Sequence, residues 1–157
     1  MILNQQHQVK VSISGLEEFS TKVRRILRIP ASALTICLVT NAEIAEWNRV
    51  YRGKNRPTDV LSFTTDEPRS KQRIRKFPGK RASSASRATS TPRYLGDIAI
   101  APVVARRNAR SLGRDFDAEM RILILHGILH LMGYDHETDQ GQMDRREMRL
   151  RRHFGLA

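Results

Sequence analysis

The segment from Met120 to Met132, MRILILHGILHLM, places the strongest limit on how this chain can fold. It is apolar around nearly the whole circumference of a helix, so other elements must cover that helix and place it in the core. Two histidines lie inside it. Because a buried polar group without a partner is costly, a fold that buries this helix must satisfy both imidazoles.

The two histidines belong to the pattern HxxxHxxGxxH. His126 and His130 are about 40° apart around a helix and one turn apart along it, so both imidazoles project from one face. Gly133 can end the helix with a positive φ and turn the chain so that His136 returns to the same point. We therefore predict that His126, His130 and His136 bind one metal ion. The alternative is that each imidazole finds a separate polar partner.

The ligand set indicates the kind of metal site. Three imidazoles leave the fourth position of a tetrahedral ion open for water, as in catalytic zinc sites, whereas structural zinc sites are closed and usually include cysteine. The one cysteine, Cys37, lies in the apolar run LTICLV. A buried inert thiol is its expected role, and a catalytic thiol is the alternative. We predict one Zn²⁺ per chain.

The same spacing occurs in metzincin proteases, HExxHxxGxxH, with one departure in this chain. Gly127 stands where those enzymes have a glutamate. A metalloprotease needs that carboxylate beside the metal to deprotonate the attacking water. The departure disfavours peptide hydrolysis, and a metzincin-like metalloprotease remains an alternative.

The N-terminal part predicts a strand followed by a helix. Residues 8–13 alternate apolar and polar side chains, which is the period of a strand with one buried face. Ser14 and Glu17 then form an S-x-x-E capping box, and apolar residues recur at helical spacing until Pro30. We therefore expect the first strand at 8–13.

The unit then recurs along the chain. The apolar run 34–39 predicts a strand buried on both faces, and Thr40 with Glu43 repeats the capping box ahead of a second helix. Short β-like runs follow at 59–63 and 95–101.

The remainder, from Pro102, is helical in pattern, with Gly113 as a stop for one helix and Asp115 as a cap for the next. The total is about four strands and five helices. At 157 residues the chain fits one domain, 1–157. We predict an α+β fold, with a small mixed sheet packed against helices that include the metal-bearing one.

The net charge of +12 is concentrated in one segment. Nine Lys or Arg and no acid occur between Pro68 and Arg93, so 12 − 9 leaves +3 for the rest. This composition predicts a basic, flexible insertion at about 66–93. Either it contacts a polyanion or it is a solvated insertion without a specific role. The candidate nucleic-acid contacts are Arg73, Arg75, Lys76, Lys80 and Arg81.

No apolar stretch approaches the roughly 18 residues that a membrane span requires. The N-terminus, MILNQQHQVK, lacks the pattern of a secretory signal. We expect a cytoplasmic protein without a membrane partner.

Three blocks of the sequence resemble the YbeY family. HGILHLMGYDH at 126–136 is similar to its signature, and NRVYRGKNRPTDVLSF at 48–63 and LGDIAI at 95–100 are similar to its second and third blocks. Met143 and Glu147 fall where the family's C-terminal helix often carries such residues. The basic stretch is a departure, since family members usually have a shorter and often acidic connection there.

The resemblance implies a four-stranded sheet and a zinc-dependent, single-strand-specific endoribonuclease. Its expected roles are ribosomal RNA processing, including late small-subunit rRNA maturation, and ribosome quality control. The implied partners are single-stranded or ribosomal RNA and the ribosome or small-subunit assembly factors. A non-catalytic ribosome-associated RNA-binding factor is a further alternative.

The resemblance also implies that the three motif histidines bind zinc and that Arg52 is important for activity. A guanidinium can bind two phosphate oxygens and stabilise the charge that builds up during phosphodiester cleavage, although Arg52 could also be a solvated loop charge. Asp97 and Asp135 are candidates for orienting the metal-binding imidazoles by accepting hydrogen bonds from them. For Asp97 the alternative is a purely structural hydrogen bond or ion pair.

Overall fold

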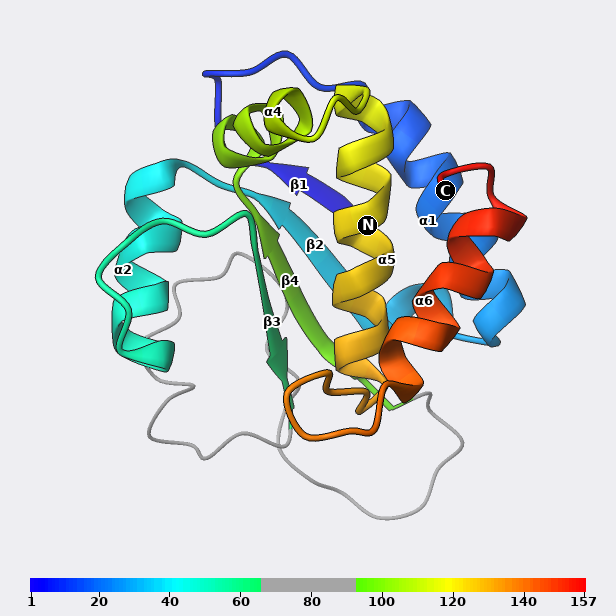
Figure 1. Ribbon diagram of the computed structural model, residues 1–157. Coiled ribbons are helices and arrows are strands. Elements are labelled where there is room, and N and C mark those ends of the chain that lie inside the picture. The colour runs from blue at the N-terminus through cyan, green and yellow to red at the C-terminus, as the bar shows by residue number, and fades with distance from the viewer. Residues whose placement is uncertain (66–92) are drawn as a thin grey trace.

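The structure is a computed structural model that describes residues 1–65 and 93–157. Its four strands form one mixed sheet in the order β1-β2-β4-β3 (Figure 1). The pairs β1·β2 and β2·β4 are parallel, whereas β3 runs antiparallel to β4 at the edge. The strands are β1 (Ile2–Asn4), β2 (Leu34–Leu38), β3 (Val60–Thr64) and β4 (Gly96–Ile100).

Five α-helices accompany the sheet in the described ranges, which confirms the predicted α+β class. A 3-10 turn at Ala31–Ala33 precedes β2. The helices are α1 (Ile13–Leu27), α2 (Asn41–Arg52), α4 (Pro102–Ser111), α5 (Phe116–Leu131) and α6 (Gln142–His153). None of the helices that the structure describes is long and apolar enough to cross a membrane.

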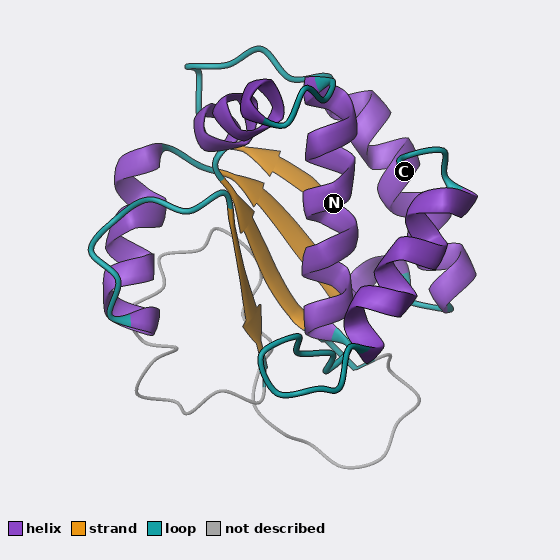
Figure 2. Ribbon diagram, viewed as in Figure 1, coloured by secondary structure: helices purple, strands orange, loops and turns teal. Residues whose placement is uncertain are grey.

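Alternating side chains of β2 and β4 divide the core between the two faces of the sheet. Ile36 and Ile98 belong to a cluster with residues of α1, α5 and α6. Cys37 and Ala99 belong to a second cluster, which includes Ile44 and Trp47 of α2. Helices α1, α5 and α6 therefore lie on one side of the sheet, where α5 packs directly against β3 and β4 and α6 packs against α5, and α2 lies on the other side (Figure 2).

The first strand lies elsewhere than predicted. It is β1 at residues 2–4, where Ile2 pairs with Ile36 of β2, and not 8–13. Val9 is buried without a strand, because the Gln6 side chain accepts from the Val9 N–H and donates to its carbonyl, each at 2.9 Å. The alternating apolar residues at 8–13 thus belong to a loop, which the Gln6 side chain stabilises by hydrogen bonds, and to the first residue of α1.

The first capping box was also wrong. Helix α1 begins one residue before Ser14, and its N-cap is Ser12, whose side chain makes no capping bond. Glu17 instead accepts a hydrogen bond from the backbone N–H of Ile2, which ties β1 to α1. The Glu17 carboxylate therefore stabilises the position of β1 and does not cap its own helix.

The second capping box is confirmed. Thr40 accepts from the Glu43 N–H at 3.3 Å, and the Glu43 carboxylate accepts from the Thr40 N–H at 2.9 Å. Asp115 caps α5 through the N–H of Ala118, and Gly113 has a φ of +63° just after α4. These local signals set the start of the helix that ends at Arg52 and of the helix that bears two of the histidines.

Candidate metal centre

The C-terminal half of α5 and the loop after it bring the three histidines together. The Gly133 φ of +92° ends the helix as predicted, and His136 returns toward His126 and His130. The three ring centroids are 4.7, 5.5 and 5.3 Å apart, and one ligand nitrogen from each ring lies within 4.8 Å of the others. This arrangement is a candidate site for one metal ion.

The packing of α5 against β4 favours glycine at the second position of the motif, Gly127. A Cβ built there would lie 2.7 Å from Cγ2 of Ile98 on β4. The Gly127 carbonyl also accepts from the Ser62 hydroxyl of β3 at 3.3 Å. Because α5 approaches the sheet so closely here, residue 127 faces Ile98 of β4, and a glutamate would need the Ile98 side chain to shift. The packing of α5 on the sheet therefore disfavours a glutamate at the position of the protease carboxylate.

His126 is oriented by a buried carboxylate from α6. Its Nδ1 lies 2.7 Å from Oε2 of Glu147, which is 6% exposed, and Arg151 pairs with the other carboxylate oxygen. An Nδ1–H that donates to Glu147 leaves the Nε2 lone pair of His126 directed away from the carboxylate, as a metal ligand requires. Burial acts to raise the pKa of Glu147, but the hydrogen bond and charge of His126 and the charge of Arg151 hold it below its ordinary value.

His130 lies in a position that favours the neutral imidazole. Its Nε2 is 3.1 Å from Nε2 of His126. Burial lowers the pKa of His130, and the neighbouring His126 and His136 lower it further. A neutral ring with a free lone pair is the form that binds a metal ion.

Asp135 orders the loop that presents His136. Its carboxylate accepts from the Glu137 N–H at 3.0 Å and from the Thr138 hydroxyl at 3.1 Å. The hydrogen bond from Glu137 is the main reason that the pKa of Asp135 is lowered. These contacts stabilise the loop. That Asp135 also orients a metal-binding imidazole stays a prediction.

Arg52 reaches the same loop from the other face of the sheet. It is the last residue of α2, and its Nη2 lies 2.9 Å from Oε1 of Glu137, next to His136 in the chain. It lines a cavity of about 380 Å³ together with Lys54 and Arg56. The structure thus brings Arg52 to the histidine loop across 85 positions of sequence.

Comparison with known proteins identifies the family. The family model described as Endoribonuclease YbeY matches residues 1–155. This chain belongs to the YbeY endoribonuclease family. The predicted family and reaction class, hydrolysis of RNA, are thereby confirmed, and the protease and the non-catalytic binding factor are disfavoured.

Individual YbeY proteins match along nearly their whole length. Endoribonuclease YbeY of Sulfurovum sp. (strain NBC37-1) is 32% identical over 154 residues, which cover 98% of this chain and 90% of that protein. Its counterpart in Bacillus mycoides (strain KBAB4) is 37% identical over 147 residues, with coverages of 92% and 86%. A solution structure of a Thermotoga maritima protein is 27% identical, with a TM-score of 0.54 and coverages of 95% and 85%.

Two carboxylates of the YbeY-like blocks serve the sheet in the described contacts. Asp97 accepts from the Tyr94 hydroxyl, which also lies 2.9 Å from the Thr35 hydroxyl of β2. Burial, and then the bond to Asp97, raises the pKa of Tyr94. Asp59 accepts from the Val60 N–H and from the Asn108 amide. The role of Asp97 behind a metal ligand stays a prediction.

The YbeY-like site also contains one residue whose role sequence reasoning missed. The family resemblance places Glu147 in the C-terminal helix and implies no role for it. Met143, Glu147 and Leu150 recur at helical spacing and are buried, so a carboxylate in an apolar stripe was the available signal. The candidate nucleic-acid contacts Arg73, Arg75, Lys76, Lys80 and Arg81 lie outside the described residues.

Proposed function

We propose that this YbeY protein is a zinc-dependent endoribonuclease that cleaves single-stranded RNA in the cytoplasm. Its proposed tasks are ribosomal RNA processing, including late small-subunit maturation, and ribosome quality control, in contact with the ribosome or small-subunit assembly factors. The observation that carries the proposal is the meeting of His126, His130 and His136 beside a loop that also holds Arg52.

The donor set fits zinc. Three imidazoles, one of them held by a buried carboxylate, match the ligands and outer contacts of catalytic zinc sites. A bound zinc ion would supply a Lewis acid and an acidified water. We propose His126, His130 and His136 as its ligands and Glu147 as the residue that orients His126.

Arg52 would act on the substrate. The Arg52 side chain is 41% exposed, and within residues 1–65 and 93–157 its one ion-pair partner is the carboxylate of Glu137. An exposed pair of this kind is weak, so a phosphodiester can compete for the guanidinium. Arg52 would then bind non-bridging phosphate oxygens and stabilise the charge that develops during cleavage. The basic residues between 68 and 93 would add affinity for RNA.

The proposal predicts different outcomes for two variants. His130→Ala should lose both bound zinc and cleavage of single-stranded RNA, because two imidazoles hold zinc poorly. Arg52→Gln should keep zinc but lose about 10²–10³-fold in kcat, as when one transition-state donor is removed. The zinc content per chain and the cleavage of labelled single-stranded RNA are measured on the same preparations, with and without chelator. Casein is tested in parallel as a protease substrate.

Arg49→Gln is the matched control, because Arg49 is an exposed arginine of the same helix paired with Glu46. It should retain zinc and activity. Full zinc occupancy in His130→Ala would refute the ligand assignment. Equal losses in Arg49→Gln and Arg52→Gln would refute the role of Arg52, and cleavage of casein instead of RNA would refute the function.

A further inference from the structure

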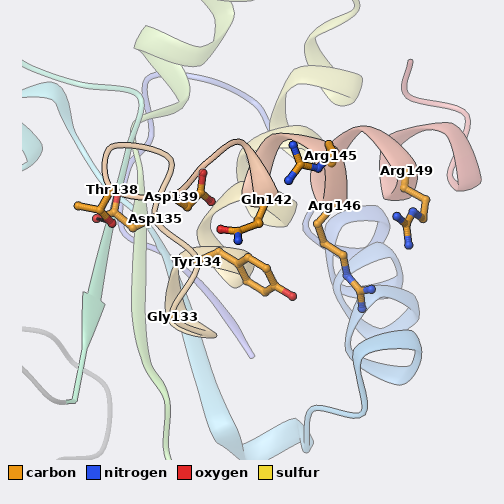
Figure 3. Close-up of a pocket in the computed structure, with 9 residues that line it drawn as sticks. All are labelled: Gly133, Tyr134, Asp135, Thr138, Asp139, Gln142, Arg145, Arg146 and Arg149. Atoms are coloured by element: carbon orange, nitrogen blue, oxygen red, sulfur yellow. Dashed lines mark hydrogen bonds between the residues drawn. The ribbon is translucent and has the colours of Figure 1, made fainter.

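A second cavity borders the histidine loop, and Arg52 does not line it. It has a volume of about 560 Å³, within the range of about 300–1,000 Å³ common for ligand sites. The loop after α5 forms one wall, and the first two turns of α6 form the other (Figure 3). Its walls include Tyr134, Asp135, Arg145, Arg146 and Arg149.

One face of α6 supplies the basic wall. This face begins with Gln142. Three arginines follow it by three, four and seven positions and therefore share its side of the helix: Arg145, Arg146 and Arg149. The buried side of the same helix carries Glu147, which holds His126. The arginine row is therefore fixed relative to the candidate metal centre by one rigid element.

The acids of the cavity are already engaged by the backbone. Asp139 accepts from the N–H groups of Gly141 and Met143, each at 2.7 Å, and Asp135 accepts from the loop that follows it. These carboxylates cap the turn and the start of α6, so they are not paired with the arginines.

The arginines are left to an outside ligand. Across residues 1–65 and 93–157, no ion pair involves Arg146 or Arg149, and Nε of Arg146 is buried without a hydrogen bond. Arg145 donates to the Gln140 carbonyl at 3.1 Å, which uses one of its five N–H groups. Such a group of guanidinium donors matches the oxygens of a phosphodiester.

Tyr134 adds a flat surface beside these cations. It follows Gly133 and precedes His136 by two positions, and Figure 3 shows its ring within the cavity with the hydroxyl end directed toward the arginine side. Unpaired RNA bases stack on aromatic side chains, whereas bases in a duplex are already stacked on each other. An aromatic ring next to these arginines is a combination suited to one nucleotide of a single strand.

We propose that this cavity binds a nucleotide of the RNA substrate next to the bond that is cleaved. Arg145, Arg146 and Arg149 bind its phosphate, and Tyr134 stacks on its base. Together with Arg52, which contacts Glu137 of the same loop, the cavity would position the RNA strand next to the histidines. The inference rests on the proposed function, since it assigns a subsite to that same centre.

The first test measures binding of a fluorescent single-stranded oligoribonucleotide in chelator, so that affinity is read without cleavage. Arg145→Gln combined with Arg149→Gln should weaken binding about tenfold. It should also reduce the slope of log K against log salt by about 1.4, since each lost contact to a single strand contributes about 0.7. With zinc restored, KM should rise while kcat changes less than about twofold.

The matched control combines Arg106→Gln with Arg110→Gln, which removes the same charge from exposed positions of α4 outside the cavity. It should leave the salt slope unchanged.

Equal effects of the two double variants, or parental binding by the Arg145 and Arg149 variant, would overturn the subsite. If the parent cleaves RNA in that case, the proposed function stands without it. If the parent does not cleave RNA but binds it through the cavity arginines, the cavity stands as an RNA-binding site and the proposed function fails.

The second test separates base from phosphate. Tyr134→Leu should lose about tenfold in RNA affinity, because stacking on the base is lost, and Tyr134→Phe should retain it. Inorganic polyphosphate, which has no bases, should bind the parent and Tyr134→Leu equally. Unchanged RNA affinity in Tyr134→Leu, with circular dichroism showing a folded chain, would remove the base from the proposal.

Discussion

Glu147 shows how a single buried residue sets the chemistry of another. Its carboxylate lies between His126 and Arg151, on the core side of α6. The hydrogen bond to Nδ1 selects the tautomer of His126 that can bind a metal through Nε2. Glu147 would therefore act on a bound metal through a histidine, as a positioning residue rather than a ligand.

Removing the charge of Glu147 should weaken metal binding. Glu147→Gln keeps the size of the side chain, but it makes the hydrogen bond to His126 weaker and leaves Arg151 without its anion. We expect zinc affinity to fall by about 10–100-fold, as is usual for residues that support metal ligands. Competition with a chromogenic chelator measures the affinity.

Asp144→Asn is the control, because Asp144 is an exposed acid of the same helix and the charge change is the same. It should leave zinc affinity unchanged. Parental affinity in Glu147→Gln would show that the carboxylate has no part in the site.

At the scale of elements, the contact between α5 and β4 decides where the histidines lie. Gly127 lets the helix approach Ile98 closely, with no room for a Cβ. The carbonyl of the same residue accepts from Ser62 on the edge strand β3. The residue at the position of the protease glutamate thus fixes how closely α5, which carries His126 and His130, packs on the sheet.

Gly127→Ala should destabilise the fold by about 1–3 kcal/mol, the usual cost of adding a methyl group to a packed core. Urea unfolding followed by circular dichroism measures the change. Gly15→Ala in α1 is the matched control, since its Cβ would meet only the Ser12 side chain at 3.1 Å. Alanine there should be neutral or stabilising by up to about 1 kcal/mol. Equal effects at the two positions would contradict the packing account.

At the scale of the whole molecule, the central strand β2 is covered on both faces. Cys37 lies on it between Leu3 of β1 and Ala99 of β4 and has no exposed surface. Burial raises the pKa of the Cys37 thiol to about 12, with the charges of Asp97 and Glu43 adding to the rise. The thiol is inert in the folded protein, as the sequence predicts, and its reactivity reports opening of the sheet.

The raised pKa has a definite sign for stability. Below about pH 9 the thiol is protonated in both the folded and the unfolded chain. Between about 9 and 12 the unfolded chain releases the proton while the fold retains it, so the stability attributable to Cys37 is lost as the pH rises. The stability advantage of the parent over Cys37→Ala should therefore shrink by about 1–2 kcal/mol between pH 7.5 and 10.5. Urea unfolding of both proteins at each pH measures it, and a constant difference would contradict a buried neutral thiol.

The sequence by itself determined the features that depend on local spacing. The histidine trio, the turn at Gly133 and the caps at Thr40 and Asp115 each involve residues within ten positions, so the pattern carries the geometry. The expected numbers of about four strands and five helices followed from the period of apolar residues, although the first strand was assigned to the wrong residues.

Only the tertiary structure decided the features that depend on distant partners. Strand β1 has three residues and forms because β2 pairs with it, so no periodicity marked it and the loop at 8–13 was mistaken for it. Glu147 reaches His126 across 21 positions, and Arg52 reaches Glu137 across 85. Sequence spacing does not encode these distances, because they arise only when helices on both faces of the sheet pack against it. The histidines thus predict a metal from the sequence, while the packed fold determines what surrounds it.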